Sequence, residues 1–298
     1  MRYKCVVSVG NCADLGPTEY LRYLLQDKET KVIGFYLESL RDGRCFFETL
    51  RKAKASKPVV ILKGGRTDKG QRVASSHTGA LAGNDNLWEA LSRQTGAILT
   101  NSIDEFIDTL LVFQCLDLTP ASWDNTVLFG NGGGASVLAT DVMARCGLEL
   151  QDITTPTAKA LGELIQDPGT SLKNPVDIPS GTMRQEDGMI VEKVLYELTS
   201  LDRPKAVIFH LNMPQFLTNP NMPPQVFDNL VKSAINVKKR GAASYILLVL
   251  RSDGSELLNE RKRQAAVAAL EAGIPVYNEI ADAINALAFV KQFEMFRQ

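Results

Sequence analysis

Short runs rich in β-branched residues alternate with longer segments of helical periodicity along nearly the whole chain. Strands that are buried on both faces read as continuous apolar runs, whereas the helices that cover them read as periodic segments. In a chain of 298 residues, this alternation predicts parallel sheets that are covered by helices on both faces. The predicted fold class is therefore α/β, with three layers in the order helix, sheet, helix.

The first series of apolar runs lies in the N-terminal part of the chain. It comprises predicted strands at residues 5–9, 32–37, 59–63 and 97–100, followed by a predicted helix over residues 103–116. Ser102 and Glu105 have the capping-box spacing at the start of that helix. Their hydroxyl and carboxylate groups can accept hydrogen bonds from free N–H groups of the first turn, which defines where the helix begins.

A second series follows. It comprises predicted strands at residues 127–129, 148–153, 206–211, 245–250 and 275–277, and a final apolar helix over residues 280–293. Residues 117–125, between the two series, are rich in residue types that form loops. We therefore expect two domains, residues 1–119 and residues 120–298. Residues 212–224 contain four prolines and are predicted to form a long surface loop.

The two predicted domains differ in their number of strands. Five strands are the number in a flavodoxin-like sheet, and the first series offers only four. If both domains are the same structural unit, the first lacks its opening strand and helix. We therefore expect two successive flavodoxin-like domains, of which the first is incomplete at its N-terminus.

Composition excludes several classes of protein. The net charge is −1, so no strong field attracts nucleic acid, an anionic membrane or an acidic partner. No apolar run approaches the length of a membrane-spanning helix, and the first residues lack the pattern of a signal peptide. The five cysteines are scattered and only two histidines are present, which argues against a disulfide scaffold and against a metal site. We expect a cytoplasmic protein.

A Ser-His-Thr-Gly motif precedes a helical segment in the first domain. It consists of Ser76, His77, Thr78 and Gly79. A helix N-terminus presents free N–H groups and a partial positive charge, so hydroxyl groups and small residues there suit a phosphate group. A neutral imidazole in such a pocket can accept a phosphoryl group. The alternative is that Ser76 or Thr78 caps the helix and that His77 is a polar surface residue.

Glu38 directly follows the predicted strand at residues 32–37. We expect it to project from the carboxyl end of a parallel strand, where sheets of this kind place their sites. A carboxylate there can keep one nitrogen of His77 protonated and leave the other free as a nucleophile. The alternative for Glu38 is a solvated glutamate in a loop.

A glycine-rich turn follows the predicted strand at residues 127–129. The turn from strand to helix contains Gly132, Gly133 and Gly134. Because glycine has no side chain, the backbone N–H groups of this turn can approach a phosphate closely. The same turn fits the dinucleotide spacing G-x-G-x-x-A, with Asp152 as the candidate ribose partner. A tight turn without a ligand is the third reading.

Two other polar features receive no catalytic role. Residues 174–181 place polar side chains around two prolines, a pattern typical of a loop. His210 ends an apolar run, and a single histidine in that position is usually a hydrogen-bonded core residue.

Several longer runs of the sequence match a known family in order and over nearly the whole chain. In the first half they are SVGNCADLG, LLQDKETKVIGFYLES and KPVVILKGGRTDKGQRVASSHTGALAG. In the second half they are FGNGGGASVLATDVMARCGLEL and NPVDIPSG. With these runs the chain resembles the nucleoside-diphosphate-forming (ADP-forming) acyl-CoA synthetases, relatives of succinyl-CoA synthetase.

This resemblance implies a role for each candidate residue. His77 would be the residue that is phosphorylated, and Glu38 the carboxylate that steadies it. Ser76, Thr78 and Gly79 would bind phosphate beside His77, and Gly132, Gly133 and Gly134 would begin a helix of the second domain that completes the pocket. The implied reaction converts acyl-CoA, phosphate and ADP into carboxylate, CoA and ATP, and is reversible. It passes through an acyl phosphate and then a phosphohistidine.

The chain also departs from the family. The Rossmann-type CoA-binding domain, the Ser-rich phosphate loop and the ATP-grasp domain have no counterpart in this sequence. We therefore expect no tightly bound cofactor, and expect the main sites for CoA and for ADP or ATP with magnesium to lie outside this chain. The expected partners are CoA-binding and ATP-grasp domains or subunits and a small carboxylic acid or its acyl-CoA, within an oligomer. The chain would then be a fragment or one subunit.

Two other functions stay open. One is a catalytically silent regulatory or assembly module related to this family, which retention of the Ser-His-Thr-Gly motif disfavours. The other is a dinucleotide-binding oxidoreductase built on the glycine-rich turn, for which no hydride-transfer residues are evident.

Overall fold

The computed structural model describes residues 1–10, 12, 14–67, 69–70, 72, 85–119, 122–123 and 125–298. By spatial contacts the chain divides into two compact units. The first consists of Met1–Pro120 together with Phe289–Gln298, and the second of Ala121–Ala288. The last helix, α13 (Ile280–Arg297), therefore contributes residues to both units. The residue pattern did not predict that the C-terminal residues pack with the first unit.

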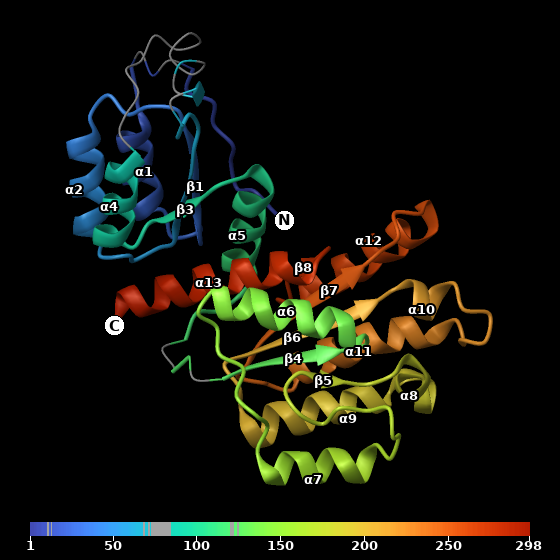
Figure 1. The fold of residues 1–298 in the computed structure, drawn as a ribbon. Coiled ribbons are helices and arrows are strands. Elements are labelled where there is room, and N and C mark those ends of the chain that lie inside the picture. Colours follow the sequence, from blue (N-terminus) through green and yellow to red (C-terminus); the bar gives the residue numbers. More distant parts are fainter. Residues whose placement is uncertain are drawn as a thin grey trace. The chain divides into compact units, whose positions relative to one another are not determined.

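The first unit contains a parallel sheet with helices on it (Figure 1). Its strands are adjacent in the order β1 (Ile33–Leu37), β2 (Val59–Lys63) and β3 (Ile98–Thr100). Its helices are α1 (Pro17–Gln26), α2 (Gly43–Ala53), α4 (Asp85–Thr95) and α5 (Ile103–Cys115). The core joins α1, α2 and α4 to one face of β1 and β2 through buried side chains such as Leu21, Ile33, Phe46, Ile61 and Trp88.

Helix α5 packs against β1 at Gly34, which has no side chain. A Cβ atom on Gly34 would come within 2.8 Å of Phe106 and 3.0 Å of Leu110, so only glycine lets these side chains approach the strand. The helix begins as predicted, because the Ser102 hydroxyl accepts a hydrogen bond from the Glu105 N–H at 3.1 Å. The Glu105 carboxylate, however, accepts from the N–H of Asn101 at 2.5 Å instead of that of Ser102.

The second unit contains a five-stranded parallel sheet. Its strands are β4 (Thr126–Gly130), β5 (Val176–Asp177), β6 (Ala206–Asn212), β7 (Tyr245–Arg251) and β8 (Val276–Tyr277). They are arranged in the order β5-β4-β6-β7-β8, which is the 2-1-3-4-5 order of a flavodoxin-like fold. The predicted α/β class with parallel sheets is therefore confirmed.

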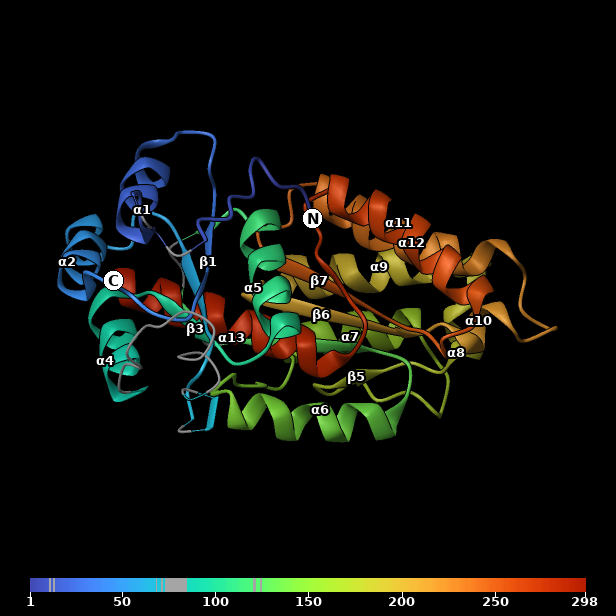
Figure 2. The ribbon, with the colours of Figure 1, turned by 90° about the horizontal axis from the view of Figure 1, so that it is seen from above.

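Helices cover both faces of this sheet. They are α6 (Gly133–Arg145), α7 (Thr155–Leu164), α8 (Ser180–Met183), α9 (Ile190–Glu197), α10 (Pro214–Leu217), α11 (Gln225–Lys239), α12 (Glu256–Glu271) and α13, with a 3-10 turn at Gln185–Gly188 and a π-helical turn at Leu198–Asp202. Helix α6 lies on one face, with α7 and α9 on the other (Figure 1). Helix α12 packs beside α11, as the view in Figure 2 shows.

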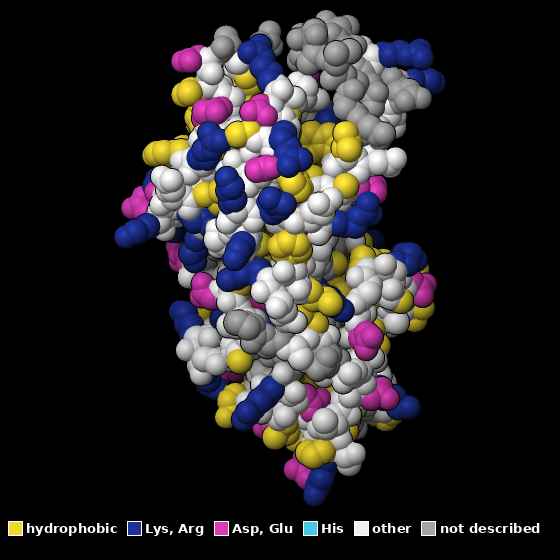
Figure 3. All heavy atoms as spheres, turned by 90° about the vertical axis from the view of Figure 1, so that its left-hand side faces the viewer, with side chains coloured by type: hydrophobic (Ala, Val, Ile, Leu, Met, Phe, Trp, Pro, Cys, Tyr) yellow, Lys and Arg dark blue, Asp and Glu magenta, His cyan; other side chains and the backbone are white. Residues whose placement is uncertain are grey.

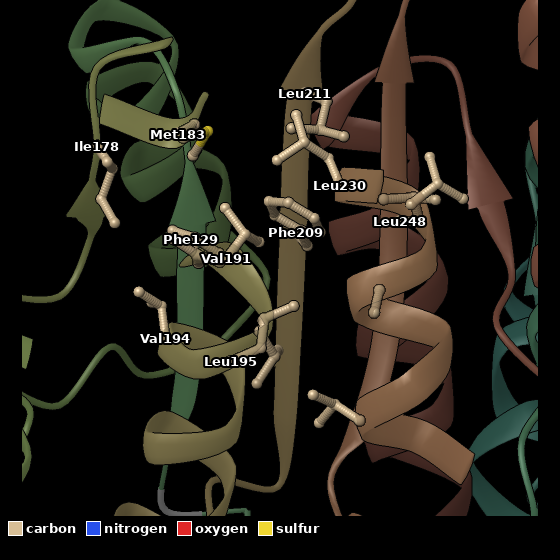
Figure 4. Packing of buried hydrophobic residues seen from close by; sticks show 14 of the residues in the cluster. Phe129, Ile178, Met183, Val191, Val194, Leu195, Phe209, Leu211, Leu230 and Leu248 are labelled. Atoms are coloured by element: carbon tan, nitrogen blue, oxygen red, sulfur yellow. The ribbon is translucent and has the colours of Figure 1, made fainter. Parts of the chain in front are cut away.

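The main core of the second unit lies between the sheet and α8, α9 and α11 (Figure 4). Phe129 of β4 and Phe209 of β6 are register partners, and their rings stack with centroids 4.8 Å apart. Met183, Val191 and Leu230 close over them from the helices. Because every second side chain of a strand points to the same face, residues such as His210 face the opposite layer.

The predicted strand at residues 148–153 is wrong. The Glu149 carbonyl accepts from the Thr126 N–H of β4 at 3.2 Å, but Asn174 then lies between this segment and β4: its side-chain amide donates to the Thr126 carbonyl at 2.7 Å and to the Gln151 carbonyl at 2.9 Å. Its carbonyl oxygen accepts from the Leu128 N–H at 3.1 Å. One side chain thus satisfies backbone groups that a neighbouring strand would otherwise pair. The fifth strand of the sheet is β5, in a segment that was predicted to be a loop.

Two further predictions need correction. Residues 5–9 form no strand: Val6 is 81% exposed and Val7 51% exposed, so these β-branched side chains have no buried face to occupy. Residues 212–224 are not a simple surface loop, because they contain α10 and bury Met213 and Phe216 in the core. Burial of these apolar side chains, which have helical spacing, stabilises a short helix even though the segment contains four prolines.

The surface carries charges of both signs. On the face that bears α2, Lys and Arg side chains are mixed with Asp and Glu side chains (Figure 3); one such pair is Arg44 with Glu48, at 2.7 Å. None of the five cysteines, all of which are among the described residues, forms a disulfide bond. Among the helices in the described part of the chain, none combines the length and the apolar character that crossing a membrane requires.

Candidate functional site

The carboxyl edge of the first sheet brings together polar side chains from all three strands. Leu37 and Lys63 are register partners at the ends of β1 and β2, so Glu38 and Gly64 follow side by side. The Gly64 N–H donates to the Leu37 carbonyl at 2.9 Å and joins the two strand ends. Glu38 therefore lies at the sheet edge where parallel folds bind ligands.

Glu38 has one oxygen engaged and one without a partner. Its Oε1 accepts from the Tyr36 hydroxyl at 3.1 Å. Its Oε2 is buried and has no hydrogen-bond partner among the residues that the structure describes. Desolvation and the hydrogen bond to Glu38 raise the pKa of Tyr36, so this hydroxyl is a donor at neutral pH. A buried carboxylate oxygen without a donor is unfavourable, which makes Oε2 the natural acceptor for a further N–H group.

Lys63 is a buried cation beside Glu38. Its side chain is only 6% exposed, its ammonium lies 5.9 Å from the centre of the Trp88 ring, and it donates to the Gly64 carbonyl. Burial lowers the pKa of Lys63, while the negative charges of Asp85 and Glu38 oppose that shift. The edge therefore combines a carboxylate and a partly desolvated ammonium group within one small region.

Arg66 and Asp85 connect the segments on either side of residues 67–84. Arg66 donates through Nε to Asp85 Oδ1 at 2.6 Å and through a terminal nitrogen to Oδ2 at 2.9 Å. Another terminal nitrogen donates to Asn101, which follows β3, at 2.5 Å. The hydrogen bonds from Arg66 lower the pKa of Asp85. The predicted site residues Ser76, His77, Thr78 and Gly79 lie outside the described residues.

The second unit has its own candidate site at the carboxyl end of β4. The strand order reverses between β4 and β6, which is where flavodoxin-like sheets bind ligands. Gly132 has a φ of 125°, a conformation that favours glycine, and Gly133 and Gly134 begin α6 with exposed backbone. The predicted glycine residues thus stand at a helix N-terminus, where backbone amides can bind an anion.

An internal carboxylate already faces these amides. Asp177, at the end of β5, accepts from the Gly132 N–H at 2.8 Å, and its other oxygen lies 3.1 Å from where a Cβ on Gly133 would be. A phosphate at the same amides would have to share them with Asp177 or displace it. The residue pattern did not single out Asp177, which is 45 positions from Gly132 in the sequence.

Protein side chains also occupy the region at the carboxyl ends of β4 and β6. Asn131 is 2% exposed, donates to Gln215 at 2.8 Å and accepts from the Asn212 N–H at 3.0 Å. Asp152, the candidate ribose partner, lies in a loop because residues 148–153 form no strand. The dinucleotide pattern needs that residue at the end of the second strand, so its structural context is missing.

His210 is a core residue, as predicted, 4% exposed near the end of β6. Of its two ring nitrogens, Nε2 is buried and has no hydrogen-bond partner among the described residues. Burial, together with the positive charge of Arg251, lowers the pKa of His210 to about 4. In the described part of the chain, no group of three or more His, Cys, Asp and Glu side chains could hold a metal ion.

Comparison with known proteins agrees with this architecture. Residues 1–113 match the family model of the succinyl-CoA ligase like flavodoxin domain. The chain is 30% identical, over 98% of its length, to the alpha subunit of ADP-forming acetate–CoA ligase I of Pyrococcus furiosus. It is 36% identical, over 66% of its length, to the alpha subunit of ligase II of that organism. The chain is a relative of the ADP-forming acyl-CoA synthetases.

The chain spans only part of these synthetases. It covers 59% of the length of the ligase I alpha subunit and 42% of that of ligase II. In structure it resembles acetyl-coenzyme A synthetase 1 of Ca. Korarchaeum cryptofilum, solved in complex with phosphate and ADP. The TM-score is 0.80 at 24% identity, over 98% of this chain and 59% of that chain. This likeness shows that the two proteins share a fold.

Proposed function

We propose that this chain is part of an ADP-forming acyl-CoA synthetase and that phosphoryl groups pass through His77. The observation that carries the proposal is Glu38 Oε2, a buried acceptor without a donor at the carboxyl edge of the first sheet. Arg66 and Asp85 are joined by a hydrogen bond at this edge, and His77 lies between them in the sequence. Similarity to two alpha subunits of acetate–CoA ligases also supports the proposal.

The proposed reaction has three steps. A phosphate oxygen attacks the thioester carbon of acyl-CoA, which gives an acyl phosphate and releases CoA. The free nitrogen of His77 then attacks the phosphorus atom, the bond to the acyl oxygen breaks, and the carboxylate leaves. The phosphohistidine finally transfers its phosphoryl group to ADP, which gives ATP and restores the neutral imidazole.

Each site residue has a proposed part in these steps. Glu38 accepts the N–H of one His77 nitrogen, so that the other nitrogen carries the lone pair that attacks phosphorus. Ser76, Thr78 and Gly79 bind the phosphate oxygens. The amides at Gly132, Gly133 and Gly134 provide a further anion site, provided that Asp177 gives way.

The remaining parts of the activity are proposals as well. We propose that CoA and ADP or ATP, the latter with magnesium, bind mainly on CoA-binding and ATP-grasp domains or subunits that work with this chain. The substrate would be a small carboxylic acid or its acyl-CoA, and the assembly an oligomer in the cytoplasm. The relatives named as alpha subunits support the expectation of a partner subunit.

The test is phosphorylation of the purified chain with acetyl phosphate, followed by intact mass measurement at neutral pH. We expect one acid-labile phosphate that is lost in His77→Ala and retained in His210→Gln, the matched control at the only other histidine. Glu38→Gln should slow its formation about tenfold, since one charge-assisted hydrogen bond is weakened. Each variant is accepted only if its unfolding transition matches that of the wild type.

A second function has one observation in its favour. Asp177 already supplies a carboxylate to the Gly132 amide, as expected of a module that no longer binds phosphate there. This reading predicts a catalytically silent regulatory or assembly module. A chain that takes up no phosphate, either alone or with an ATP-grasp subunit supplied, would favour this reading over the synthetase.

A further inference from the structure

Tyr36 and Glu38 form a hydrogen-bonded pair at the end of β1. The two residues are two positions apart, so their side chains lie on the same side of the strand. The Tyr36 hydroxyl lies 3.1 Å from Glu38 Oε1, while the residue as a whole is 60% exposed. The side chain is therefore large but contributes little to the core, and its hydroxyl bonds to the Glu38 carboxylate.

Gly64 provides the surface on which this pair lies. A Cβ on Gly64 would come within 3.0 Å of the Tyr36 hydroxyl and 3.4 Å of Glu38 Cγ. Gly64 is not among the glycines with positive φ, so its backbone does not itself require glycine. Because Gly64 has no side chain, Tyr36 and Glu38 can pack closely against the backbone at the end of β2.

We propose that Tyr36 is a positioning residue for Glu38. Its hydroxyl holds Oε1, so that Oε2 is the oxygen left to accept the N–H of His77. This inference rests on the proposed function, which assigns His77 as the phosphorylated residue. Fixing the acceptor fixes which imidazole nitrogen keeps its proton, and therefore which nitrogen is nucleophilic.

The kinetic test compares Tyr36→Phe, Glu38→Gln and the double variant in phosphorylation by acetyl phosphate. Tyr36→Phe should lower the maximal rate about three- to tenfold, the range expected for one hydrogen bond, and leave the half-saturating concentration unchanged. In the double variant Tyr36→Phe should add nothing further, because its effect acts through Glu38. The control is Tyr23→Phe, at a tyrosine of α1 that is 64% exposed; its rate should stay at the wild-type value.

A spectroscopic readout separates positioning from general stability. The chain has only two histidines, so ¹⁵N-histidine NMR with His77→Ala as the assignment reference reports the tautomer of His77 directly. Glu38→Gln should reduce the tautomer preference, and Tyr36→Phe should move the His77 signals in the same direction. Tyr36→Phe signals and rates like those of the wild type, with Glu38→Gln altered, would overturn the inference.

Gly64→Ala gives a second, independent variant. The added methyl should push the Tyr36 hydroxyl away from Glu38 and reproduce the rate and the NMR pattern of Tyr36→Phe. The control is Gly43→Ala, where a Cβ meets nothing within 4 Å, and it should leave both unchanged.

If the wild type takes up no phosphate, the proposed function fails. The NMR comparison still decides whether Tyr36 acts on His77 through Glu38.

Discussion

Arg66 and Asp85 form a two-pronged ion pair, with Nε to Oδ1 at 2.6 Å and a terminal nitrogen to Oδ2 at 2.9 Å. Arg66 follows β2 and Asp85 begins α4, so the pair joins the end of β2 to the start of α4. Both side chains are only partly exposed, at 24% and 33%. Bidentate geometry and partial burial make this pair stronger than an ordinary surface ion pair.

Asp85→Asn should therefore destabilise the first unit. We expect the free energy of unfolding to fall by about 1 kcal/mol, since one carboxylate–guanidinium pair is lost at a half-buried position. This loss of stability is measured by urea unfolding monitored by Trp88 fluorescence. Trp88 belongs to the first unit and Trp123 to the second, so Trp123→Phe in both proteins leaves a signal from the first unit alone. Glu48→Gln, which removes the more exposed Arg44–Glu48 pair, is the control and should have a smaller effect.

The same pair predicts part of the acid sensitivity of the first unit. Arg66 lowers the pKa of Asp85 in the folded state, so the unfolded chain binds a proton at higher pH than the native protein does. The contribution is present above the unfolded pKa of about 3.9 and is lost as the pH falls through the lower folded pKa. Between pH 5 and pH 3 the wild type should thus lose more stability than Asp85→Asn; equal losses would contradict this assignment.

Two glycines of the β4–α6 turn should respond in opposite ways to alanine. At Gly130 a Cβ would lie 2.4 Å from the His210 carbonyl oxygen and 3.0 Å from its Cβ, so Gly130→Ala must separate β4 from β6. We expect a loss of at least about 3 kcal/mol, or failure of the second unit to fold. Gly134→Ala, where a Cβ meets nothing within 4 Å, should stabilise α6 by about 0.5 kcal/mol. Thermal unfolding of both variants checks the contrast.

The five cysteine thiols should differ widely in reactivity. Cys5 is exposed, whereas burial raises the pKa of Cys115 to about 11. At pH 8 about one Cys115 thiol in a thousand is then ionised, and the thiolate is the reactive form. Timed labelling with N-ethylmaleimide, read by peptide mass spectrometry, should modify Cys5 first and Cys115 last. The difference should disappear in urea; rapid labelling of Cys115 in the native protein would contradict its burial.

The sequence predicted the long buried strands well because their signal is local. β2, β6 and β7 are continuous apolar runs that are buried on both faces, and such runs are typical of parallel strands. β5 has only two residues and was missed. The strand predicted at residues 148–153 failed because Asn174, distant in the sequence, takes the edge of β4. No local pattern encodes that competition.

The same difference between local signals and contacts that are distant in the sequence explains which site residues could be predicted. Glu38 could be found because the apolar run at residues 32–37 marks where a parallel strand ends, and strand ends place ligand sites. Tyr36 was missed because its contact depends on the absent side chain of Gly64, which follows β2. Asp177 was missed because its meeting with Gly132 depends on β5 lying beside β4. The sequence shows residue types, whereas these contacts arise from strand pairing.

His210 should make the second unit lose stability in mild acid. Its folded pKa of about 4 lies below the unfolded value of about 6.5, so between these pH values the unfolded chain binds a proton that the native protein does not. The free energy of unfolding should therefore fall by about 3 kcal/mol as the pH is lowered from 6.5 to 4. Urea unfolding monitored by Trp123 in a Trp88→Phe background measures this fall in the second unit.

His210→Leu should remove most of this pH-dependent loss, because leucine does not titrate. The substitution breaks no hydrogen bond of the buried Nε2, which has no partner among the described residues. An unchanged pH dependence in that variant would show that another group controls it.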